Sequence, residues 1–142
     1  MKMRIVVDTD VFVSALLGGG AAKAVVAACL GGRFTPLMGP ALVAEYEAQL
    51  GRTGLFKRSR LNAVEREELF DIFAAACRWT RVYYGWRPNL RDEGDNHVIE
   101  LAVAGNAQAI VTRNTRDFTL ACELRFPQLR IVTPALLLKG EP

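Results

Sequence analysis

The chain opens on the stretch Arg4-Ile5-Val6-Val7-Asp8-Thr9-Asp10, a short apolar run that ends abruptly in acidic residues. The apolar, β-branched residues of Arg4–Val7 predict a short buried strand that ends at Asp8. From this point segments with helix and strand signals alternate to the C-terminus. Further strands are expected at 34–38, 80–84, 109–112 and 130–132. The alternation predicts an α/β domain whose central sheet is mainly parallel and is flanked by helices in three layers.

The expected helices fill the spaces between these strands. They lie from about 11 to 30, with an interruption at 18–20, and at 40–50, 62–77, 95–104, 117–124 and from 134 onward. Asn62 is expected to cap the third of them, because Glu65 follows three residues later. Helical periodicity predicts that this helix buries one apolar stripe, formed by Leu69, Ile72, Phe73, Ala76 and Cys77.

The length and composition fit a single domain spanning residues 1–142. Of the 142 residues 51% are hydrophobic and 23% are charged, so the chain can bury a core. No apolar run approaches the roughly 18 to 20 residues that span a bilayer, and no signal peptide precedes Asp8. We therefore expect a soluble, cytoplasmic protein with no membrane partner. The three cysteines, Cys29, Cys77 and Cys122, are far apart in the sequence, which argues against disulfides or a zinc-thiolate site. We expect them to be small, buried hydrophobic side chains.

The charge distribution is mildly basic. Eighteen Lys and Arg against 15 Asp and Glu give a formal net charge of +3. Basic residues occur at 52–60 and at 78–91 without an acidic residue between them. A solvated surface explains either run when it is taken alone. A basic surface beside an acidic site would instead indicate nucleic acid.

Polar residues follow the predicted strands at the positions where α/β sheets bind ligands. Such sites lie beyond the carboxyl ends of parallel strands, where the strand order reverses. Asp8 follows the first strand, and Thr112 and Asn114 follow the strand at 109–111. Other acidic residues stand near the ends of neighbouring elements, namely Glu45, Asp92, Glu93, Asp95 and Asp117. These carboxylates are distant in sequence, but the fold can bring them together.

Several carboxylates in one pocket repel each other, and each raises the pKa of its neighbours. A fold tolerates this cost mainly where a hard cation offsets it, and ligands that are all oxygen favour Mg²⁺ or Mn²⁺ over zinc. Such an ion can activate a water molecule against a phosphodiester. The chain contains no nucleophile elbow and no P-loop. Its single histidine, His97, is interpreted as a surface residue on the first turn of a helix rather than as a general base.

Four segments in order resemble the PIN-domain family. Val7–Leu17 is similar to that family's strand ending in D-T-N followed by S-A-L, and Pro40–Glu45 to its P-x-L-x-x-E. Arg91–Ala102 resembles R-D-x-x-D-N/D-x-x-L-E-x-A, and Val111–Phe118 resembles the last segment. In addition to these four segments, Val132-Thr133-Pro134 resembles the closing strand and helix of the family. Within this family, the segments most resemble the toxins of bacterial toxin–antitoxin pairs.

The resemblance implies a ribonuclease that depends on Mg²⁺ or Mn²⁺. By position, the catalytic metal ligands would be Asp8, Glu45, Asp95 and Asp117. Polar support would come from Thr9, Asp10, Thr112 and Asn114, and from Asp92 acting through water. Arg113 and Arg116 flank the expected pocket, where they either contact RNA phosphates or are ordinary surface charges. A homodimer and an antitoxin partner are also implied.

This sequence departs from the family pattern at three positions. Asp10 replaces the usual Asn and either joins the ligands or points away. Asn96 and Asn114 stand where many relatives carry Asp. Periodicity does not orient Glu45, which falls in a gap between two sides of its helix. The assignment of Glu45 therefore depends on the resemblance.

Three other interpretations remain open. The asparagines favour a non-catalytic module that binds RNA or protein. Asp8-Thr9-Asp10 also matches the D-x-D of haloacid-dehalogenase-like phosphatases, where Asp8 would be the nucleophile, but no Lys occurs between Lys57 and Lys139. Four aromatic residues could stack on bases, although packing in the core or in a dimer is the simpler explanation: Trp79, Tyr83, Tyr84 and Trp86.

Overall fold

A computed structural model describes residues 2–82, 96–116, 118, 126 and 128–140. Several of the predicted functional residues lie outside these ranges: Asp92, Glu93, Asp95 and Asp117, together with Tyr83, Tyr84, Trp86 and Cys122.

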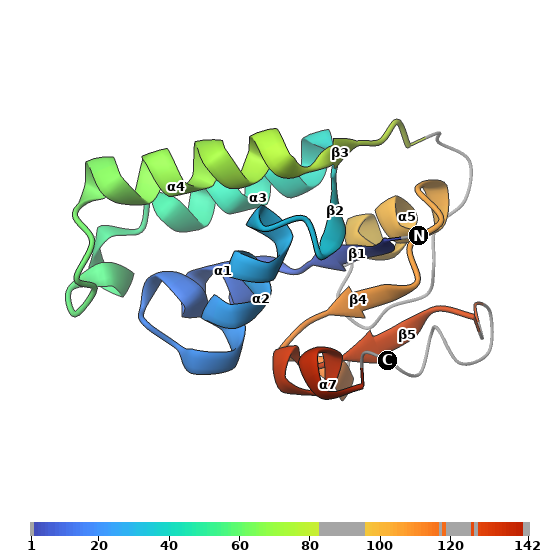
Figure 1. The fold of residues 1–142 in the computed structure, drawn as a ribbon. Coiled ribbons are helices and arrows are strands. Elements are labelled where there is room, and N and C mark those ends of the chain that lie inside the picture. The colour runs from blue at the N-terminus through green and yellow to red at the C-terminus, as the bar shows by residue number, and fades with distance from the viewer. Residues whose placement is uncertain (1, 83–95, 117, 119–125, 127, 141–142) are drawn as a thin grey trace.

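The described strands form one five-stranded sheet in which every pairing is parallel. Its order is β3-β2-β1-β4-β5, with β1 (Met3–Val7) in the centre. On one side of β1 lie β2 (Phe34–Met38) and β3 (Arg78–Trp79), and on the other β4 (Ala109–Val111) and β5 (Arg130–Val132). Helices flank the sheet (Figure 1). The predicted α/β class with a parallel central sheet is confirmed.

The helices connect the strands as the alternation predicts. They are α1 (Thr9–Leu16), α2 (Gly20–Leu30), α3 (Pro40–Leu50), the 3₁₀ helix η1 (Thr53–Phe56), α4 (Ala63–Ala76), α5 (Asn96–Ala104) and α7 (Pro134–Lys139). None of the helices in the described part of the chain is by itself long and apolar enough to cross a membrane. Only α1 and α2 together reach that length and composition, and this pair is bent by 104°.

A cluster of aromatic rings joins α1, α3 and α4. The Tyr46 ring lies 5.1 Å from Phe12 and 5.6 Å from Phe70, and it stacks on Phe73 with an interplanar angle of 5°. All four side chains are buried. The pair α3 and α4 extends beyond the sheet with η1 at its far end (Figure 1). The cluster therefore fixes the orientation of α3 against α1 and the end of β1.

Two predictions about α4 and the strand after it were wrong. Phe73 and Cys77 are buried as the predicted stripe requires, but Ile72 is 56% exposed and Ala76 is also exposed. Arg66 and Phe70, which the prediction left out, are buried instead. Helical periodicity counts Arg66 as a polar, exposed residue. It therefore assigns the buried face of α4 to the side that carries Ile72. Arg66 instead lies over the Phe56 ring at 4.4 Å and donates to the Leu61 carbonyl at 2.6 Å, so this basic side chain belongs to the buried face of α4.

The strand expected at 80–84 begins earlier. In the structure Arg78 pairs with Leu37 and Trp79 with Met38, and Thr80 already follows β3. The two tyrosines of the expected strand lie outside the described residues. Trp79 is 58% exposed on this edge strand, so packing in the core of this chain does not explain it.

The two described cysteines, Cys29 and Cys77, are free and buried. This confirms the expectation of small buried side chains for these two. Burial raises the pKa of both thiols to about 12, so they stay protonated at neutral pH.

Candidate active site at the carboxyl edge of the sheet

Asp8 stands where the strand order reverses. The chain leaves β1 toward β2 on one side, and β4 lies on the other, which makes the end of β1 a topological switch point. The Asp8 amide donates to the Val111 carbonyl at 2.9 Å. One carboxylate oxygen, Oδ1, accepts from the Thr9 amide at 2.9 Å, and Oδ2 accepts from the Thr112 hydroxyl at 2.8 Å. Asp8 is only 6% exposed, so its orientation is tightly defined.

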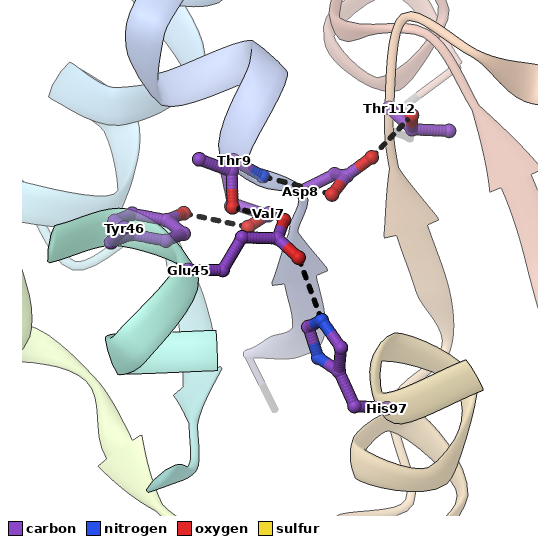
Figure 2. A network of polar contacts seen from close by, with 7 residues as sticks. All are labelled: Val7, Asp8, Thr9, Glu45, Tyr46, His97 and Thr112. Atoms are coloured by element: carbon purple, nitrogen blue, oxygen red, sulfur yellow. Dashed lines mark hydrogen bonds and ion pairs between the residues drawn. The ribbon is translucent and has the colours of Figure 1, made fainter. Parts of the chain in front are cut away.

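Glu45 projects from α3 toward the same edge. Its Oε1 accepts from the Thr9 hydroxyl at 2.6 Å, so Thr9 links the Asp8 and Glu45 carboxylates (Figure 2). The next residue, Tyr46, fixes α3 at this place because its hydroxyl donates to the Val7 carbonyl at 2.6 Å. The structure thus resolves the orientation that periodicity left open.

His97 belongs to this site, and its interpretation as a surface residue was wrong. It projects from the first turn of α5 toward Glu45, and its Nε2 lies 2.8 Å from Glu45 Oε2 (Figure 2). A signal for this was present in the sequence. His97 precedes Leu101 by four residues, and Leu101 is buried, so the two share one face of α5.

Glu45 is held in its ionised form. Burial alone would raise its pKa, but the hydrogen bonds from His97 and Thr9 outweigh that effect and lower the pKa of Glu45. The site therefore presents a charged, oriented carboxylate next to Asp8.

Asp10 turns toward the loop after β4. Its Oδ1 and Oδ2 lie 3.3 and 3.2 Å from the Arg113 amide, which donates to them. Burial raises the pKa of Asp10, and the hydrogen bond from Arg113 only partly offsets this. In the same loop the Asn114 amide donates to the Thr112 hydroxyl at 3.0 Å. Asp10 and Thr112 thus shape the 112–114 loop beside Asp8.

The remaining predicted residues divide into two groups. The side chains of Arg113 and Arg116 are exposed on this loop. Asp92, Asp95 and Asp117 lie outside the described residues, although the described α5 starts at Asn96, directly after Asp95. Within the described ranges no three His, Cys, Asp or Glu residues are grouped so as to hold a metal ion.

A comparison with protein families matches residues 4–116 to the PIN domain. The chain belongs to the PIN-domain family. The match contains Asp8, Glu45 and Asp95 and ends one residue before Asp117. No curated protein and no solved structure matched the chain.

Membership indicates a nuclease-type function, because PIN domains are generally nucleases. It also argues against the haloacid-dehalogenase interpretation of the D-x-D. PIN domains typically use divalent metal ions. The donors described in this PIN domain suit such an ion, since Mg²⁺ is bound by one or two carboxylates and keeps several waters. Asp8 and Glu45 are two carboxylates, the hard oxygen donors that such an ion prefers, and both contact Thr9.

Asp10→Asn is expected to make this PIN domain slightly more stable at pH 7 in EDTA. The folded state raises the pKa of Asp10 above its ordinary value of 3.8. Because the folded state favours the protonated form of Asp10, this side chain stabilises the fold fully only below pH 3.8. The stabilisation is lost as the pH rises through the raised pKa. An Asn keeps an acceptor for the Arg113 amide and removes the buried charge. We expect a gain of a few tenths of a kcal/mol at pH 7.

Urea unfolding at pH 7 and at pH 4 measures this effect. The gain should shrink as the pH is lowered toward 4, because the raised pKa of Asp10 lets the folded state bind the proton more readily than the unfolded chain. Asp71→Asn, on the exposed face of α4, is the matched control and should show no such change. A lower stability of Asp10→Asn at pH 7 would show that the charge stabilises the fold.

Proposed function

We propose that this PIN domain is an endoribonuclease that depends on Mg²⁺ or Mn²⁺ and hydrolyses RNA phosphodiester bonds. The observation that carries the proposal is the pair of carboxylates, Asp8 and Glu45, joined through Thr9 at the switch point of the sheet. Buried like-charged groups are costly unless a cation offsets them. A divalent ion bound here supplies an activated water and stabilises charge on the phosphate.

Two further ligands complete the proposed site. We assign Asp95 with Asp8 to the principal metal, and Glu45 and Asp117 to the rest of the pocket, with Asp92 acting through water. The placement of His97 against Glu45 supports a role for Asp95, because His97 follows Asp95 by two residues and brings the start of α5 to this edge. Thr9 and Thr112 orient the Asp8 carboxylate through its two oxygens.

The segment 112–116 that follows β4 supplies positive charge beside this acidic pocket. Arg113 and Arg116 are exposed there, and the Arg113 amide is held by Asp10. We propose that these arginines contact RNA phosphates, which makes substrate binding weaker as salt rises.

Removal of the metal is expected to abolish cleavage. Purified protein should cut a fluorescently labelled single-stranded RNA with added Mg²⁺ or Mn²⁺ and lose that activity in excess EDTA, with recovery when Mn²⁺ is restored. A small phosphomonoester serves as the control substrate and should not be turned over. Undiminished RNA cleavage in excess EDTA would overturn the proposal.

A second candidate is a module that binds RNA or protein without cutting. Asn96 and Asn114 favour it, because each removes a carboxylate that many relatives carry. Calorimetric titration with Mn²⁺ separates the two candidates. Saturable binding together with cleavage supports the nuclease, and RNA binding with neither supports the module.

We further propose that the protein is the cytoplasmic toxin of a toxin–antitoxin pair, acting as a homodimer. The support is the resemblance of its motifs to that subgroup. Expression of the wild type in bacteria should arrest growth, and expression of Asp8→Asn should not. A small open reading frame beside the gene should encode a protein that relieves the arrest. Light scattering tests the dimer.

A further inference from the structure

One hydrogen-bonded chain connects three helices at the carboxyl edge of the sheet. Thr9 at the start of α1 donates to Glu45 Oε1 at 2.6 Å, and His97 at the start of α5 lies 2.8 Å from Glu45 Oε2 through its Nε2. Each oxygen of the Glu45 carboxylate therefore has a partner from a different element (Figure 2).

The chemistry of the pair fixes the direction of the second hydrogen bond. An ionised carboxylate can only accept hydrogen bonds, and a glutamate side chain is ordinarily ionised at neutral pH. The hydrogen between Nε2 and Oε2 must then belong to His97. Since Nε2 carries this hydrogen, it has no lone pair to offer to a metal ion. His97 contacts Glu45 as a donor and not as a ligand through this atom.

Glu45 needs such a partner because its side chain is long and partly exposed. Its side chain is 30% exposed, and that of His97 is 22% exposed. A glutamate that becomes ordered loses much of the rotamer freedom of its long side chain. With Thr9 alone, one oxygen would be held and the carboxylate could rotate about it. The contact from α5 fixes the plane of the carboxylate.

We propose that His97 is a positioning residue of the nuclease site, which holds Glu45 in the orientation that binds the divalent ion. The inference rests on the proposed function. Partners that orient metal-binding side chains typically change metal affinity or activity by 10- to 100-fold when they are lost. His97 would act from the same helix start that follows the proposed ligand Asp95.

Two substitutions of His97 distinguish positioning from a general effect on folding. His97→Gln places an amide N–H near the position of Nε2, so it can still donate to Glu45. His97→Asn is one methylene shorter and reaches only the position of Nδ1. Val103→Ala, in a half-buried position on the same helix, is the control for a simple loss of packing.

His97→Asn is expected to lower kcat by about 10- to 100-fold and to weaken Mn²⁺ binding by a similar factor, with little change in the KM for RNA. His97→Gln should stay within about threefold of the wild type in both measurements. Val103→Ala should lower the melting temperature without moving either value. Calorimetric Mn²⁺ titration gives a readout that does not depend on activity.

The outcomes separate this inference from the proposed function. An active wild type with His97→Asn equally active and equally able to bind Mn²⁺ would overturn the positioning role alone. Equal losses in His97→Gln and His97→Asn would also overturn it, because the imidazole itself would then be required. A wild type that binds Mn²⁺ but does not cut RNA would overturn the nuclease, while the titrations would still decide the role of His97. A wild type with neither property would overturn both.

Discussion

Asp8→Asn is expected to lower RNA cleavage by at least about a thousandfold, which corresponds to ~4 kcal/mol of transition-state stabilisation. Asp8 is the proposed ligand that the fold holds most firmly, since it is buried at the switch point and both of its oxygens accept hydrogen bonds. Loss of its charge removes a ligand that no neighbouring described carboxylate can replace without breaking its own contacts. Cleavage of labelled RNA at saturating Mn²⁺ measures the loss.

The same substitution should leave the fold intact. The Asn carbonyl can still accept from the Thr9 amide at the N-terminus of α1, where Asp8 acts as the cap. The Thr112 hydroxyl can rotate to accept from the new amide instead of donating to Oδ2. In EDTA the variant should melt at the same temperature as the wild type or slightly above it, because a repulsion with Glu45 is relieved.

Asp71→Asn, a change at an exposed position of α4 outside the proposed site, is the control for the loss of one negative charge. It should change neither cleavage nor the response to Mn²⁺. Cleavage by Asp8→Asn within tenfold of the wild type would show that Asp8 is not essential and would remove the main support for the metal site.

Much of the fold was predictable because local signals and tertiary structure agree. Phe34–Met38 and Pro40–Leu50 have the predicted bounds, and Asn62 and Glu65 form the expected capping box. A short apolar strand can bury its side chains only inside the sheet, and a capped helix begins where its capping residue stands. Local sequence signals therefore fix the bounds of these elements. The meeting of Asp8 with Thr112 also follows from the topology, because β1 and β4 are neighbours and Val7 pairs with Val111.

The parts that sequence reasoning missed depend on contacts between distant segments. Ile72 was assigned to the core because periodicity does not reveal that Arg66 stacks on Phe56. His97 was assigned to the surface because a helix start is usually exposed. Its contact with Glu45 exists only when α3 and α5 lie at the same edge of the sheet. The spacing of His97 from Leu101 along α5 indicates a shared face, but it does not identify Glu45 as the neighbour.

Tyr46→Ala is expected to cause the largest loss of stability among these changes, about 3–5 kcal/mol. The Tyr46 ring is fully enclosed by Phe12, Phe70 and Phe73, so its removal leaves a cavity where α1, α3 and α4 meet. Because a domain is typically stabilised by only about 5–15 kcal/mol, such a loss brings the chain close to unfolding. Chemical denaturation in EDTA measures it independently of the metal.

Tyr46→Phe separates the hydroxyl from the ring. It keeps the aromatic packing and removes only the hydrogen bond to the Val7 carbonyl, which is 2.6 Å long and buried. Burial raises the pKa of Tyr46 well above its ordinary value of 10.0, so the hydroxyl remains a donor at neutral pH. We expect a cost of about 1–3 kcal/mol, because the buried carbonyl loses its donor. If Tyr46→Phe costs as much stability as Tyr46→Ala, the hydroxyl and not the ring fixes α3 against β1. The position of Glu45 beside Thr9 and His97 would then depend on this one hydrogen bond.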